Sequence, residues 1–336
     1  MDLQRSIFKG LHPQLPSLSE SGGSSGDSES TDAAVSAEFK PVPWTSYFET
    51  RRTVTLEDST EFNIFASGLD KTDGPILLLH HGAGHSGLTF GLLAKYMSAT
   101  EPGFTVVAPD ARGHGDSGGS STDLSLDQMV NDLAGIFGTL FPDNSRSVVL
   151  AGHSMGGAVV AHIARSKRIP KATGLVLIDI VEGSAMSSLH AIPGFITARP
   201  SSFPSLEAAI HWHIEAQEIQ NPQSARLSVP SLVRKRDDGR WTWRTSLLVT
   251  EKFWRGWYEG LSKTFVESPV AKLLILAGSD RLDKELLISQ MQGKFQLELL
   301  PVAGHTIQED LPEQMGSILA SFWKRNQPLN IPRPPA

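Results

Sequence analysis

Five short runs of almost wholly apolar residues recur along this chain, each bounded by Gly, Asp or Pro. They cover residues 76–80, 104–108, 147–151, 174–180 and 272–277. A strand with one face in water alternates apolar and polar residues, whereas a strand buried on both faces is apolar throughout. The five runs therefore predict strands of a parallel sheet that is covered on both sides.

Patterns typical of helices alternate with these runs and cover residues 87–98, 124–140, 156–166 and 310–325. Strands and helices that alternate along a chain predict a doubly wound α/β domain, with helices on both faces of a mostly parallel sheet. Residues 46–66 alternate apolar and polar positions instead, and we expect an antiparallel hairpin at the edge of the sheet.

Three other segments set the expected domain limits. Residues 1–36 include a stretch of Ser, Gly, Asp and Glu that cannot bury enough apolar surface to offset ordering, so we expect a disordered tail. Residues 327–336 are rich in proline and predict an extended tail. The folded domain is then residues 37–326. Within it, residues 184–268 break the strand–helix rhythm and are rich in Pro, Trp and His, which indicates a helical cap or lid.

Charge and cysteine content narrow the possible partners and locations. The 336 residues include 30 Lys and Arg against 36 Asp and Glu, a net charge of −6, so we expect no general attraction for nucleic acid or an anionic membrane. The absence of cysteine excludes thiolate nucleophiles and disulfides and fits a reducing compartment. No apolar run approaches the roughly 20 residues of a membrane span. We expect an intracellular protein, cytoplasmic or nuclear.

One serine lies among glycines between a predicted strand and a predicted helix. The sequence Gly-His-Ser-Met-Gly, residues 152–156, has the form of a nucleophile elbow, the tight turn that raises a reactive serine above the sheet of many hydrolases. Side chains at Gly152 and Gly156 would collide with the neighbouring strand and helix. Ser154 is therefore the predicted nucleophile.

The partners of Ser154 must come from distant parts of the chain. His305 follows an apolar run and precedes the last helix, the position of the base in the order Ser…Asp…His. Two residues can supply the acid: Asp280, which follows the strand 272–277, and Asp179, which lies at the end of the strand 174–180. Spacing alone does not separate them.

The loop after the first predicted strand, His-Gly-Ala-Gly at 81–84, predicts an oxyanion hole. The backbone amide of Ala83 would join that of Met155 around the negative oxygen of the tetrahedral intermediate. His80, His81 and His85 lie nearby, but no carboxylate spacing beside them indicates a metal site. We expect neither a metal ion nor an organic cofactor.

Several further segments resemble the protein phosphatase methylesterase family over about residues 38–325. The elbow and the sequence Arg-Gly-His-Gly occur in many hydrolases and say little about the substrate. The segments specific to the family are LIDIVEGSAM at 177–186, FWRGWYEGLS at 253–262 and DRLDKELLISQMQGKFQ at 280–296. They occur in the family's order. The chain departs from the family's pattern at residues 81–84, where the family often has three glycines after the histidine. We expect this difference to have little effect on the oxyanion hole, because only the backbone amide of Ala83 is needed there.

The resemblance implies a serine esterase that removes the methyl ester from the C-terminal leucine carboxylate of the protein phosphatase 2A catalytic subunit. It also implies that the acid is Asp179. Two alternatives stay open: a small-molecule esterase or lipase of the same fold, and a scaffold that binds the phosphatase with little catalysis. In the cap, five tryptophans can form a peptide groove or a small lid core, and Arg199 and Arg255 can meet acidic groups on a partner or lie in solvent.

Overall fold

The structure, a computed structural model, describes residues 38–119, 123–143, 145–278 and 282–327. The tail expected at 1–36 lies outside these residues, as does the tail at 327–336 apart from Gln327. Asp280 also lies outside them. The two tails therefore stay predictions, and so do the cap limits 184–268, although the structure describes the residues between them.

A single eight-stranded sheet forms the centre of the described chain, in the order β1-β2-β4-β3-β5-β6-β9-β10. β1 and β2 form the expected antiparallel hairpin at one edge, β2 also pairs antiparallel with β4, and the remaining neighbours are parallel. The strands are β1 (Thr50–Thr55), β2 (Glu61–Ser67), β3 (Ile76–His80), β4 (Thr105–Pro109), β5 (Val148–His153), β6 (Ala172–Ile178), β9 (Ala271–Leu276) and β10 (Gln296–Leu299). The five apolar runs are β3, β4, β5, β6 and β9, and the predicted mostly parallel sheet of a doubly wound α/β domain is confirmed.

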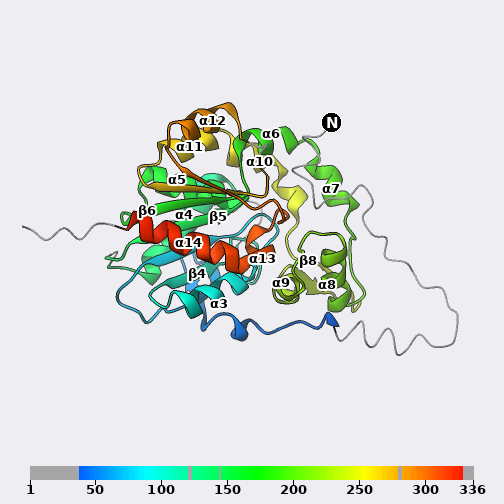
Figure 1. Cartoon of the computed structure of the whole chain (residues 1–336). Helices are drawn as coiled ribbons and strands as arrows, with labels where there is room; N and C mark the ends of the chain where they lie inside the picture. The colour runs from blue at the N-terminus through cyan, green and yellow to red at the C-terminus, as the bar shows by residue number, and fades with distance from the viewer. Residues whose placement is uncertain (1–37, 120–122, 144, 279–281, 328–336) are drawn as a thin grey trace, which may run out of the picture.

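Helices cover both faces of this sheet, as predicted (Figure 1). α3 (Gly91–Thr100) and α14 (Pro312–Asn326) bury their apolar residues in one core against the sheet, and α4 (Leu126–Leu140) and α5 (Met155–Ser166) bury theirs in the other. The predicted helix 87–98 starts as a 3-10 turn, η2 (Gly87–Phe90), whose N-cap Ser86 accepts a hydrogen bond from the Leu88 amide.

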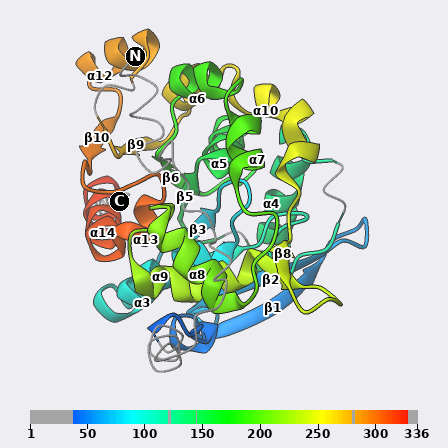
Figure 2. The same ribbon diagram turned by 90° about the vertical axis from the view of Figure 1, so that its right-hand side faces the viewer.

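The chain between β6 and β9 forms most of the remaining elements. They are α6 (Glu182–Ser188), α7 (Ile192–Ala198), α8 (Leu206–Glu215), α9 (Pro222–Ser228), η3 (Val229–Ser231), the hairpin of β7 (Val233–Lys235) and β8 (Trp241–Trp243), η4 (Leu247–Thr250), α10 (Glu251–Tyr258) and α11 (Leu261–Glu267). Figure 2 shows α9 beside α13 (Ile307–Asp310), the short helix that precedes α14, and α8 next to α9. The element α12 (Lys284–Met291) lies between β9 and β10.

The five tryptophans expected in the cap divide between two cores. Trp212 is buried in a small separate core, where Trp241 and Trp243 pack against it. Trp254 and Trp257 lie instead in the main core shared with α4 and α5, so they take no part in a separate lid core. The physical reason is that α10 turns one apolar face to α5. No helix in the described part of the chain is long and apolar enough to span a bilayer.

Candidate active site

Ser154 lies at a sharp turn between β5 and α5. Its φ of 51° and ψ of −118° place a non-glycine residue in a strained region of backbone space. A Cβ atom on Gly152 would lie 2.2 Å from the Gly156 carbonyl oxygen, and one on Gly156 would lie 2.3 Å from that of His80. Only glycine fits at either position. The turn therefore has the geometry of a nucleophile elbow.

His305 and Asp179 meet beside this turn. The Nδ1 atom of His305 lies 2.7 Å from Asp179 Oδ2. Asp179 follows β6, its side chain is fully buried, and its Oδ1 accepts a hydrogen bond from the Ala277 amide at 3.0 Å. Because the carboxylate holds Nδ1–H, the other ring nitrogen of His305 is free to accept a proton. Of the two candidate acids, the structure brings Asp179 to His305, while Asp280 lies outside the described residues.

The Ser154 hydroxyl has Tyr258, the last residue of α10, as a neighbour. Burial raises the pKa of Tyr258 to about 12, and its polar contact with Ser154 acts in the opposite direction. Within the described residues, the hydrogen bonds of His305 run to Asp179 and His153, and none joins its ring to the Ser154 hydroxyl. The two side chains must approach each other before a proton moves, as they do in many enzymes when the substrate binds.

The predicted oxyanion loop passes directly over the nucleophile. A Cβ atom on Gly82 would lie 2.8 Å from His153 Nδ1 and 3.2 Å from Ser154 Cβ. Neither the Ala83 nor the Met155 amide donates a hydrogen bond to any described residue. Met155 is also the first residue of α5, where the helix dipole favours negative charge. Both amides are therefore available to an oxyanion.

His81 holds this loop in place. The Ala111 amide donates to its Nε2 at 2.8 Å, so Nδ1 carries the proton and donates to the Gly82 carbonyl oxygen at 2.8 Å. Burial, and after it the neighbouring His114 and His80, lowers the pKa of His81 well below its ordinary value. This histidine is neutral and structural. No group of three or more His, Asp or Glu side chains among the described residues could hold a metal ion.

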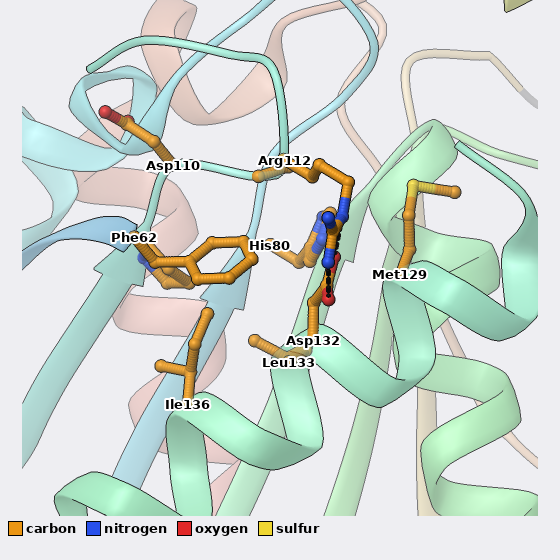
Figure 3. A pocket seen from close by; sticks show the side chains of 10 residues that line it. Phe62, His80, Asp110, Arg112, Met129, Asp132, Leu133 and Ile136 are labelled. Carbon is orange, nitrogen blue, oxygen red and sulfur yellow. Dashed lines mark hydrogen bonds and ion pairs between the residues drawn. The ribbon is translucent and has the colours of Figure 1, made fainter. Parts of the chain in front are cut away.

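The loop of residues 110–117 packs beneath the site. Arg112 donates to both carboxylate oxygens of Asp132, at 2.9 and 2.6 Å, as Figure 3 shows. The cavity beside this pair has a volume of about 10 Å³, enough for one water molecule at most. Asp110 accepts a hydrogen bond from the Gly87 amide at 2.7 Å, and burial raises the pKa of Asp110 to about 6. These residues build the loop.

One buried carboxyl group at the site gave no signal in the sequence. Glu309, on α13, accepts hydrogen bonds from Thr89 Oγ1 and Ser228 Oγ, each at 2.6 Å. Burial raises the pKa of Glu309 to about 8, while the two hydroxyl groups lower it. Thr89 belongs to η2 and Ser228 to α9. Glu309 therefore joins the sheet domain, the segment between β6 and β9, and the loop that carries His305.

Comparison with known proteins places this geometry in a family. The model of the alpha/beta hydrolase family matches residues 76–316. A probable protein phosphatase methylesterase 1 of Caenorhabditis elegans is 42% identical over 327 residues, which cover 97% of this chain and 85% of that protein. The human protein phosphatase methylesterase 1 is 37% identical over an alignment of 373 positions, which covers 97% of this chain and 95% of the human protein. The protein phosphatase methylesterase 1 of Schizosaccharomyces pombe is 39% identical over 312 positions, which cover 91% of each chain.

Solved structures support the fold. An E-2-(acetamidomethylene)succinate hydrolase superposes with a TM-score of 0.67 at 23% identity, over 82% of this chain and 99% of that one. An esterase from Mycobacterium tuberculosis superposes with a TM-score of 0.63 at 19% identity, over 90% and 100%. Identities this low carry no information about the substrate.

Proposed function

This chain belongs to the protein phosphatase methylesterase family of α/β-hydrolases and is an esterase, and we propose that it removes the methyl ester from the C-terminal leucine carboxylate of the protein phosphatase 2A catalytic subunit. The names of its relatives support a protein phosphatase as the substrate. The segments LIDIVEGSAM, FWRGWYEGLS and DRLDKELLISQMQGKFQ, which resemble the family, support the particular subunit.

The reaction starts at Ser154. His305 Nε2 accepts the hydroxyl proton while Ser154 Oγ attacks the ester carbonyl carbon, and the resulting imidazolium is stabilised by Asp179 through the 2.7 Å contact at Nδ1. A tetrahedral intermediate forms with its negative charge on the former carbonyl oxygen. The amides of Ala83 and Met155 donate to that oxygen, and each donor lowers the barrier by about 3 kcal/mol in comparable enzymes.

The rest of the reaction has two stages, formation of an acyl-enzyme and its hydrolysis. His305 returns its proton to the methoxy oxygen, the carbon–oxygen bond breaks, and methanol leaves an acyl-enzyme on Ser154. Water attacks this second ester while His305 takes a proton from it. The carbon–oxygen bond to Ser154 then breaks as His305 returns that proton to Ser154 Oγ, and the free leucine carboxylate leaves. These steps use only side chains and backbone amides of the chain itself.

The observation that carries the proposal is the contact between His305 and Asp179, two residues 126 positions apart that meet beside the elbow of Ser154. The test is methyl release from the methylated phosphatase subunit, compared with hydrolysis of p-nitrophenyl acetate. We expect Ser154→Ala to abolish both reactions, while Ser187→Ala, at an exposed serine of α6, leaves both at the wild-type rate.

Two outcomes would favour the alternative functions. Hydrolysis of p-nitrophenyl acetate without methyl release from the phosphatase subunit would indicate a small-molecule esterase. A stable complex with the subunit, formed equally by wild type and Ser154→Ala but without methyl release by either, would indicate a scaffold.

A further inference from the structure

Arg199, which follows α7, is held in place by two contacts. Its Nη2 lies 2.9 Å from Glu218 Oε1, and its guanidinium carbon lies 5.3 Å from the centre of the Trp243 ring. The side chain is 25% exposed, far less than the 70% of Arg255. An arginine side chain that is surrounded by water is free to move. Arg199 instead presents a fixed guanidinium at a partly open position.

Glu218, the partner of Arg199, forms a hydrogen bond with the loop that carries the catalytic histidine. The carbonyl oxygen of Glu218 accepts a hydrogen bond from Thr306 Oγ1 at 2.9 Å, and Thr306 follows His305. His85, two residues beyond the oxyanion residue Ala83, lies near enough to Arg199 for the arginine's charge to help lower the pKa of the His85 ring. Its ring lies 5.6 Å from that of His153, the residue before the nucleophile. Arg199, Glu218 and His85 therefore form part of one wall around the reacting groups.

The charge of this wall is small although its groups are polar. Glu218 balances the charge of Arg199. Burial lowers the pKa of His213 below its ordinary value and that of His85 well below it, so both rings are neutral. Among the described residues, neither His85 Nδ1 nor His213 Nε2 has a hydrogen-bond partner, and both atoms are buried. A ligand here meets hydrogen-bonding groups without a net positive charge.

We propose that Arg199 binds a main-chain carbonyl oxygen of the substrate peptide on the N-terminal side of the esterified residue, an inference that rests on the proposed function. A carbonyl oxygen accepts from the guanidinium and adds no charge beside Glu218. A second carboxylate at the same place would be repelled by that of Glu218. This contact distinguishes the end of a peptide from a short ester, which has no such carbonyl group.

The experiment compares two substrates for each variant: a short peptide that ends in leucine methyl ester and has no acidic residue, and p-nitrophenyl acetate. For Arg199→Met, we expect the ratio of kcat/KM for the peptide ester to that for the short ester to fall at least about tenfold, the value of a lost hydrogen bond to a charged donor. The loss should be mainly in KM. Arg199→Lys should recover part of the ratio because it keeps the charge but not the planar fork.

Two further variants separate binding from folding. Arg199→Met combined with Glu218→Gln removes the ion pair without leaving a lone carboxylate, and the ratio should fall as in the single variant. Arg255→Met, at the exposed arginine paired with Glu259 on α10, should keep the wild-type ratio.

An equal loss on both substrates would mean that Arg199 acts only through the fold, and an unchanged ratio would mean that it does not touch the peptide. Either result overturns the proposal. With a second peptide that carries an acidic residue near the ester, a loss that the first peptide does not show would also overturn the proposal, because the ligand would then be a carboxylate. A wild-type protein that hydrolyses p-nitrophenyl acetate but neither the peptide methyl ester nor the methylated phosphatase subunit would overturn the proposed function itself.

Discussion

His153, the residue before the nucleophile, donates its Nε2–H to the backbone carbonyl oxygen of His305, 152 positions later, at 2.9 Å. Their rings lie 4.6 Å apart. Burial, and after it the nearby His305, lowers the pKa of His153 to about 3. The ring is therefore neutral when the enzyme works and does not repel the imidazolium that forms on His305. The elbow thus positions the base as well as the nucleophile.

A change of His153 to phenylalanine should lower kcat by about fivefold, the effect of losing one neutral hydrogen bond of about 1 kcal/mol. The aromatic volume is kept while the bond to the His305 loop is lost. Glutamine, whose side-chain amide can donate from a similar position, should restore part of the rate. Steady-state kinetics on p-nitrophenyl acetate would measure both. Equal rates for the phenylalanine and glutamine variants would contradict the positioning role.

Asparagine at position 179 should reduce kcat by about 10⁴-fold, as loss of the acid does in other serine hydrolases, because the amide favours the wrong tautomer of the histidine. The substitution keeps the shape of the side chain, so stability should change little. Asp280→Asn is the matched control and should retain most of the activity. An inactive Asp280→Asn enzyme beside an active Asp179→Asn enzyme would assign the acid to Asp280.

Alanine at position 156 should destabilise the fold by about 3 kcal/mol, the cost of forcing a methyl group into a packed backbone contact. Its Cβ atom would lie 2.3 Å from the His80 carbonyl oxygen, in backbone that cannot move aside. Gly138→Ala in α4 is the control, since nothing lies within 4 Å of its added Cβ. We expect that control to stabilise the protein by about 0.5–1 kcal/mol. Urea unfolding of both variants would test this contrast, and a Gly156→Ala protein as stable as wild type would disprove it.

Local signals in the sequence were sufficient to predict most of the sheet. β3, β4 and β5 are buried along their whole length, so their composition alone indicates parallel strands. β10 is only half-buried and carries Gln296 and Glu298, which weakens the pattern. The hairpin of β7 and β8 was not predicted either, although Asp238-Gly239 at its turn, with a Gly239 φ of 82°, is a hairpin signal.

The candidate site was predictable where motifs fix backbone geometry, as they do at Ser154. It was not predictable where distant segments meet. Glu309 contacts Thr89 across 220 positions and Ser228 across 81, and no spacing rule relates such residues. The choice of Asp179 over Asp280 came from resemblance, because both follow strands that lie side by side in the sheet. Only the contact with His305 distinguishes Asp179 physically.

Glutamine at position 309 should make the protein progressively more stable relative to wild type as the pH rises from about 5 to 8. Burial raises the pKa of Glu309 from 4.5 to about 8, so the folded protein keeps a proton there that the unfolded chain releases above pH 4.5. The stability that this proton contributes is complete below pH 4.5 and is lost as the pH rises through about 8. The other titratable groups beside it are His85, at 3.8 Å, and Asp310.

Thermal unfolding of wild type and Glu309→Gln across this pH range would measure the difference. Ser228→Ala provides a control. The Ser228 hydroxyl lowers the pKa of Glu309, so its removal should raise that pKa, and the loss of stability with rising pH should then extend to higher pH than in wild type. Glutamine cannot ionise, yet it fills the same space and still accepts one hydrogen bond. A constant difference in melting temperature between pH 5 and 8 would therefore mean that Glu309 is already ionised in the folded protein, and that its carboxylate is held by Thr89 and Ser228 without a proton.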